Sequence, residues 1–122
     1  FFPAVAQYLK HTLDGDEDDL ERKANLEKVL ERLNTHLEQE GRTGPYLVDN
    51  GEKITLQDCA LAPKLYHMKI GLKAFKDNAI DVATQFPAVH LYMESVFSRK
   101  SFVDSLYPEE TVVWGWTNAR GQ

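Results

Sequence analysis

The stretch GEKITLQDCALAP, residues 51–63, contains the helix start around which the rest of the chain can be arranged. Thr55 is followed three residues later by Asp58, the spacing of a capping box, with Asp in place of the usual Glu. Ile54 precedes the cap and can pack on Cys59 as a hydrophobic staple. We therefore predict a helix that begins at Leu56, and loss of its cap should cost about 0.5–2 kcal/mol.

Apolar residues keep a helical period from Leu56 to about Lys76, so this helix is predicted to be the buried, central one. Pro63 lies inside it and should kink it. The consistently polar side consists of Asp58, Lys69, Lys73 and Lys76. One apolar stripe consists of Leu61, Leu65, Met68, Leu72 and Phe75, and a second stripe, of small groups, of Cys59, Ala60, Pro63, Ile70 and Gly71.

Periodicity predicts helices on both sides of this segment. A short amphipathic helix should end near Asp14-Gly15, and a long helix should cover residues 17–40, with Asp16 as its N-cap and Gly41 as its stop. Residues 41–53 are predicted to form a loop with a turn at Asn50-Gly51.

The C-terminal third is also predicted to be helical. A helix should start near Pro87, and Ser98 or Ser101 can cap a further short helix that Pro108 ends. The tail, residues 111–122, contains Trp114 and Trp116 and is too aromatic for disorder, so we expect it to fold back onto a surface. The predicted fold class is therefore an all-α helical bundle.

Composition bounds the function. The chain has 122 residues, 43% of them apolar, with 14 basic and 19 acidic side chains and a formal charge of −5. One domain over residues 1–122 is expected, and an acidic chain argues against nucleic acid as a partner. A single cysteine excludes a disulfide framework, and no apolar run reaches the ~20 residues that span a bilayer. The chain begins with Phe1 rather than Met, so we expect it to be cut from a longer protein.

No metal site is predicted. Asp14, Asp16 and Asp18 have the alternating spacing of a calcium loop, but Asp19 stands where that loop needs glycine and Asn25 where it needs glutamate. Complementation of a helix dipole explains the cluster. The four histidines show no metal-ligand spacing.

Two side chains of the central helix are candidates for chemistry. Cys59 lies in the first turn, where the helix dipole favours a thiolate, but its apolar stripe indicates a packing residue. His67 lies on an apolar stripe, where an imidazole needs a hydrogen-bond partner. It is either a core or interface histidine bonded to a neighbour, or a donor at a cleft. The residues alone contain no complete catalytic constellation.

The motifs do resemble a known family. The segments GPYL, residues 44–47, and GEKITLQDCALAP, residues 51–63, resemble the loop and central helix start of the glutathione transferase C-terminal domain. Three further motifs resemble the glutathione-dependent dehydroascorbate reductases of plants and algae: APKLYH at 62–67, FSRKSF at 97–102 and Gly115-Trp116.

The resemblance implies a two-domain enzyme of ascorbate recycling, in the cytoplasm or the chloroplast stroma. An N-terminal thioredoxin-like domain would hold glutathione, the co-substrate, and the catalytic cysteine, so that no catalytic residue lies in this chain and no cofactor is bound. By the same resemblance His67 and Trp116 would bind dehydroascorbate, His67 as a hydrogen-bond donor and Trp116 as an apolar wall.

The sequence departs from the family pattern at two places. The loop between Leu47 and Gly51 is about two residues longer than usual, which a surface loop tolerates. After Trp116 the Pro-Lys that is usual in the family is replaced by Thr117-Asn118-Ala119-Arg120. Arg120 can supply the basic group, one position later than the family's lysine.

An alternative interpretation is a non-catalytic domain of this fold that serves as a docking or assembly module in a larger complex. A membrane-inserting relative of the chloride intracellular channel type is disfavoured by the acidic, span-free sequence.

Overall fold

The computed structural model describes residues 2–11, 17–39, 42–48 and 51–121, and every regular element within these ranges is a helix. The predicted all-α class is therefore confirmed. The helices are α1 (Phe2–Lys10), α2 (Glu17–Leu37), α3 (Leu56–Phe75), α4 (Val82–Gln85), α5 (Pro87–Phe97), α6 (Lys100–Ser105) and α7 (Glu109–Ala119).

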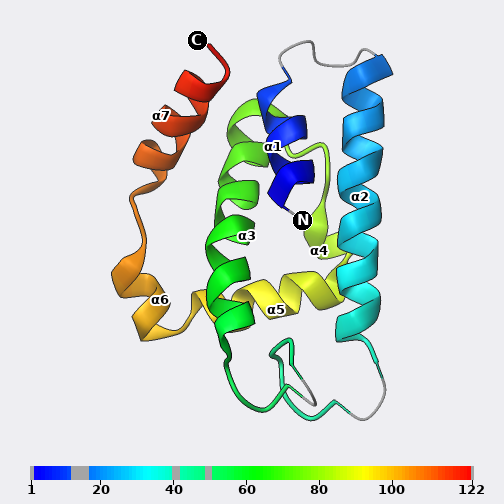
Figure 1. Ribbon diagram of the computed structural model, residues 1–122, viewed down its shortest axis with the longest axis vertical. Helices are drawn as coiled ribbons and strands as arrows, with labels where there is room; N and C mark the ends of the chain where they lie inside the picture. The colour runs from blue at the N-terminus through cyan, green and yellow to red at the C-terminus, as the bar shows by residue number, and fades with distance from the viewer. Residues whose placement is uncertain (1, 12–16, 40–41, 49–50, 122) are drawn as a thin grey trace.

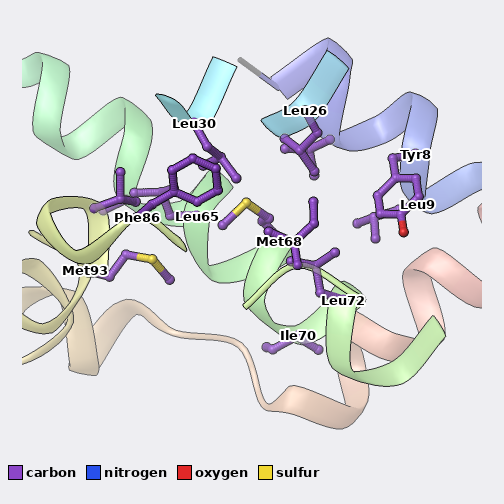
Figure 2. Close-up of a cluster of buried hydrophobic side chains, with 14 of the residues drawn as sticks. Tyr8, Leu9, Leu26, Leu30, Leu65, Met68, Ile70, Leu72, Phe86 and Met93 are labelled. Atoms are coloured by element: carbon purple, nitrogen blue, oxygen red, sulfur yellow. The ribbon is translucent and has the colours of Figure 1, made fainter. Parts of the chain in front are cut away.

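Helix α3 occupies the centre of the bundle. Figure 1 shows α1 and α2 on one side of α3, α7 along its other side, and α5 crossing near its N-terminal end. The close-up in Figure 2 shows apolar side chains from several helices converging, among them Tyr8 and Leu9 of α1, Leu26 and Leu30 of α2, and Leu65 and Met68 of α3. Leu65, Met68 and Leu72 of the predicted apolar stripe are buried, and Leu61 and Phe75 at its ends are partly buried.

The start of α3 is organised by the carboxylate of Asp58, which is fully buried. Its Oδ2 accepts hydrogen bonds from the backbone N–H of Thr55 at 2.8 Å and from the Thr55 hydroxyl at 3.1 Å, so the carboxylate half of the predicted capping box is confirmed. Its Oδ1 accepts from the backbone N–H of Leu47 at 3.1 Å and from the hydroxyl of Tyr92 at 2.7 Å. One side chain thereby joins the loop before α3, α3 itself and α5.

This arrangement also constrains Tyr92 and the loop. Burial, and then the bond to Asp58, raise the pKa of the Tyr92 hydroxyl well above its ordinary value, so Tyr92 remains a donor. Within the loop, the backbone N–H of Tyr46 donates to the Gly51 carbonyl at 3.0 Å. A Cβ on Gly44 would lie 2.1 Å from that same carbonyl oxygen, so only glycine fits there.

The opposite end of α3 is fixed by a buried ion pair between Lys76 and Asp19 of α2, with 2.7 Å between Nζ and Oδ1. The Lys76 ammonium also donates to the His11 carbonyl, just beyond α1, at 2.8 Å, and it lies 4.7 Å from the centre of the Tyr8 ring. The sequence places Asp58 and Lys76 on the polar side of α3, and both side chains are buried in the structure. Each has partners from distant segments, which periodicity cannot show.

The small-residue stripe of α3 is only partly buried. Ile70 and Gly71 are buried, but Cys59, Ala60 and Pro63 are exposed. The prediction that Cys59 packs in the interior is therefore wrong for the described residues. Figure 1 shows α1 and α7 beside the later turns of α3.

The C-terminal elements differ from their predicted caps. Helix α6 has Arg99 at its N-cap position, so neither Ser98 nor Ser101 holds that place. Pro108 stands at the N-cap of α7, after α6 has already ended at Ser105. The tail does pack on the bundle, as expected, but as a helix. Its β-branched run Thr111-Val112-Val113 and Gly115 weaken the local helical signal, and burial of Val112 and Trp116 against α3 compensates.

The remaining helix boundaries follow the sequence closely. Helix α2 ends at Leu37, a turn earlier than predicted, and α5 begins at Pro87 as predicted. The first amide groups of α5 are capped from α2, because Asn34 Oδ1 accepts from the N–H groups of Ala88 and Val89 at 2.9 and 3.1 Å. Helix α1 ends at Lys10, about a turn before the predicted end near Asp14-Gly15, and His11 follows outside the helix. The predicted Asp16 cap, the Gly41 stop and the Asn50 part of the turn lie outside the described residues. No helix of the described ranges is both long and apolar enough to cross a membrane.

Replacement of Asp58 by alanine is expected to lower the free energy of unfolding by about 3–5 kcal/mol, since it leaves four donors, two of Thr55 and one each of Leu47 and Tyr92, without their acceptor. Urea unfolding followed by circular dichroism measures this loss. Asp104→Ala is the matched control, because Asp104 is exposed and pairs only locally with Lys100 at 2.7 Å, so its loss should cost no more than about 0.5 kcal/mol. Equal losses in the two variants would contradict the role of Asp58.

Candidate functional site

A cavity of about 460 Å³ lies between α3, α7 and the end of α1. It contains both residues that the sequence singled out, His67 on α3 and Trp116 on α7. Its lining residues are Lys10, His67, Tyr107, Thr111, Val112, Trp114, Gly115, Trp116 and Ala119. We refer to this cavity as the His67 cleft.

The two predicted residues contact each other directly. The indole N–H of Trp116 donates a hydrogen bond to Nδ1 of His67 at 3.0 Å, and the two rings meet edge to face, with centroids 6.1 Å apart at 72°. Trp116 is buried, whereas His67 is half-buried. His67 is thus bonded to a neighbour and also lines a cleft, while its role as a donor to a ligand stays a prediction.

The Trp116 bond determines the protonation state of His67. An indole N–H can only donate, so Nδ1 must be unprotonated, and the neutral ring therefore carries its hydrogen on Nε2. Burial acts in the same direction, because it lowers the pKa of His67 below the ordinary value of 6.5. At neutral pH the imidazole is an uncharged hydrogen-bond donor through Nε2.

One face of α7 provides the space of the cleft. Thr111, Gly115 and Ala119 are spaced four residues apart, so they lie on one side of the helix, and all three are small. A Cβ on Gly115 would meet nothing within 4 Å, which shows that a larger side chain there would project into open space. The spacing is visible in the sequence, but it is informative only once the tail is known to be helical.

The rim of the cleft is polar and aromatic. Lys10 brings an exposed ammonium group from the end of α1, and the side chains of Tyr107 and Trp114 are 69% and 68% exposed. The sequence reasoning did not identify Lys10 or Tyr107, since nothing local places them near Trp116. The described lining includes no carboxylate, so it does not suit a cation, and the surface that it presents to the cleft is mostly apolar, with a few polar groups at the rim.

The described lining includes no cysteine, and Cys59 lies exposed on the first turn of α3, away from the His67 cleft. These residues can therefore bind and orient a ligand, but they supply no thiolate. Over the described part of the chain, no three His, Cys, Asp or Glu side chains are grouped closely enough to hold a metal ion.

A second cavity, of about 390 Å³, lies between α3, α4 and α5. Its floor includes buried Leu72, Ile80 and Met93, and its rim includes the exposed pair His90 and Glu94, with 3.0 Å between Nε2 and Oε1. It contains neither His67 nor Trp116, and its histidine is engaged in a local ion pair. The His67 cleft is therefore the stronger candidate site.

Comparison with known proteins adds an independent line of evidence. Residues 1–100 match the family model described as the glutathione S-transferase C-terminal domain. The chain is similar to the chloroplastic glutathione S-transferase DHAR3 of Arabidopsis thaliana, at 38% identity over 115 residues, which are 94% of this chain and 40% of the relative. Glutathione S-transferase DHAR2 of the same plant and the probable cytosolic glutathione S-transferase DHAR1 of Oryza sativa subsp. japonica are each 37% identical over 94% of this chain and 49% of the relative.

The chain thus spans less than half the length of these curated relatives. The extent of the matches bears on the site. The match to the family model ends at residue 100, before α7. The match to DHAR3 covers 115 of the 122 residues, so wherever it begins it must include residues 8–115. The similarity to the DHAR proteins therefore extends into the helix that walls the His67 cleft.

The lowered pKa of His67 predicts a pH dependence of stability. As the pH falls through 6.5, His67 binds a proton in the unfolded chain but stays unprotonated in the folded protein. The free energy of unfolding should therefore decrease, until the pH reaches the lowered pKa of the folded state. Urea unfolding at pH 7.5 and pH 5.0 measures the decrease. His67→Asn should reduce it, and His90→Asn, which removes an exposed histidine, should retain it. An identical decrease in wild type and His67→Asn would contradict the assignment.

Proposed function

Because the chain belongs to the glutathione S-transferase family through its C-terminal domain, we propose that it forms the substrate-site domain of a glutathione-dependent dehydroascorbate reductase. The family uses glutathione as a substrate, and dehydroascorbate reductase is the activity that the DHAR names of the relatives abbreviate. The motifs at 62–67, 97–102 and 115–116 support the same assignment.

The observation that carries the proposal is the bond from Trp116 to His67 inside the cleft. Dehydroascorbate is a small, uncharged molecule with adjacent carbonyl groups. A neutral imidazole that donates through Nε2 can bind such an oxygen, while the indole of Trp116 and Val112 supply an apolar wall. In this proposal His67 and Trp116 are the substrate-binding residues of the chain.

The chemistry itself requires the rest of the enzyme. We propose an N-terminal thioredoxin-like domain in the same protein, whose cysteine thiolate attacks dehydroascorbate. Glutathione then releases ascorbate and leaves a mixed disulfide on that cysteine, and a second glutathione restores the thiolate. Overall, dehydroascorbate gains two electrons and two protons, and two glutathione thiols become one disulfide. No metal or bound cofactor enters this scheme.

The names of the relatives indicate the cellular compartment. Their names include chloroplastic and cytosolic proteins, so we propose the chloroplast stroma or the cytoplasm as the place of action. In either compartment the proposed role is antioxidant, because reduction of dehydroascorbate returns ascorbate to use.

The function is tested in the full-length protein by ascorbate formation from dehydroascorbate, with and without glutathione. Glutathione-dependent ascorbate formation is expected. Its absence would contradict the enzyme assignment and would favour a domain that serves only for docking or assembly.

In the same assay His67→Ala should lower kcat/KM for dehydroascorbate about ten- to hundredfold, because one hydrogen bond to the substrate is lost. Trp116→Phe, which keeps an aromatic wall but removes the donor to Nδ1, should lower it less. His90→Ala is the matched control and should leave kcat/KM unchanged. A His67→Ala enzyme with full kcat/KM would exclude the role given to His67.

A further inference from the structure

We propose that Arg120 is the positioning residue of the His67 cleft: it holds the C-terminal end of α7 against α1 and α3 and so keeps Trp116 bonded to His67. The inference rests on the proposed function only in treating that pair as the substrate site. Arg120 follows the last residue of α7 and lines no part of the cleft itself.

Arg120 contacts the ends of two other helices. Its Nη1 donates to the carbonyl of Leu9 and, at 3.3 Å, to the carbonyl of His11, at the C-terminal end of α1. The last carbonyls of a helix lack partners within the helix and carry partial negative charge, so a cation there is favourable. The guanidinium carbon also lies 4.7 Å from the centre of the Phe75 ring, at the end of α3.

The position of Arg120 on α7 connects these contacts to the cleft. Its backbone N–H donates to the Trp116 carbonyl at 2.9 Å, so Trp116 lies one helical turn before the anchored residue. Movement of the Arg120 end of α7 would therefore move the indole relative to His67. The same anchor lies beside Lys10, because the Leu9 and His11 carbonyls flank that residue, so Arg120 joins the two walls of the cleft.

The other end of α7 is held less firmly. The hydroxyl of Tyr66 donates to the Tyr107 carbonyl at 3.2 Å, and Lys73 pairs with Glu109 at 3.5 Å. Both side chains of that ion pair are largely exposed, 68% and 53%, so the pair contributes little. Val112 and Trp116 are buried on α3, but apolar packing does not fix the rotation of a helix as sharply as directed hydrogen bonds do. Arg120 thus adds hydrogen bonds to α1 one turn after the bond that Trp116 itself makes to His67.

The test measures the indole N–H of Trp116 directly in the full-length protein labelled with ¹⁵N-tryptophan. Arg120→Ala is expected to speed hydrogen exchange of this N–H about tenfold, because α7 opens more readily. The indole of Trp114, which is 68% exposed, is an internal reference that should not change. Arg120→Lys keeps one cationic donor but loses the planar fork, so an intermediate rate is expected. Arg32→Ala, at an exposed arginine of α2, should match the wild type.

The backbone amide of Leu30, in the core of α2, separates positioning from general stability. Under the proposal, Trp116 exchange accelerates more than Leu30 exchange in Arg120→Ala. Equal acceleration of both groups, or no acceleration of the Trp116 indole, would overturn the proposal. If Arg120→Ala does not fold, the same comparison is made with Arg120→Lys.

Kinetics of the same variants separate this proposal from the proposed function. Arg120→Ala should raise KM for dehydroascorbate about three- to tenfold and leave KM for glutathione unchanged, since only the cleft is displaced. Accelerated indole exchange without any kinetic change would leave Arg120 as the residue that positions Trp116 and would instead contradict the cleft as the dehydroascorbate site.

Discussion

The carboxylate of Asp58 is the contact on which the arrangement of the bundle depends. It is fully buried, and its two oxygens accept hydrogen bonds from Thr55, Leu47 and Tyr92. A buried charge is tolerable only when its acceptor sites are used in this way. These donors come from three separate segments. The need to satisfy the buried carboxylate with hydrogen bonds therefore determines where α3 begins and how α5 crosses it. His67 lies further along the same helix, so its place follows from this anchor.

A second group of polar contacts, around Lys76 at the far end of α3, fixes how α1 and α3 lie relative to each other beside the cleft. Lys76 joins Asp19 and the His11 carbonyl, and Arg120 reaches the same end of α1. A buried ion pair of this kind is weak evidence for net stability, since desolvation offsets much of the attraction. Its contribution here is directional, because a buried ion pair with satisfied hydrogen bonds specifies one set of partners. The His67 to Trp116 bond lies between the two anchors.

Much of the fold was predictable from local signals. Helical periodicity and the capping box located α2, α3 and α5, because these patterns are determined within a few residues of each other. The errors concern long-range partners. Periodicity shows which side of α3 is apolar, but not how far along that side other helices extend, so it predicts a packed Cys59 that is exposed and does not reveal that Lys76, on the polar side, is buried. The helical tail escaped prediction because its β-branched residues and Gly115 conceal a helix that tertiary packing stabilises. Of the site, His67 and Trp116 could be identified, whereas Lys10 and Arg120 depend on contacts across most of the chain.

The Trp116 bond has a consequence for selectivity that follows from proton placement alone. An indole N–H directed at Nδ1 opposes a second proton on the ring, so under the proposed function His67 meets dehydroascorbate as a neutral donor. An imidazolium would bind an anion more tightly than an uncharged carbonyl compound and would retain an anionic product such as ascorbate. A neutral donor discriminates far less by charge, so a dehydroascorbate cleft built on it can hold the uncharged substrate without trapping the anion that forms. Lys10, the one formally charged residue in the described lining, is exposed and screened by solvent, so the described interior of the cleft is uncharged.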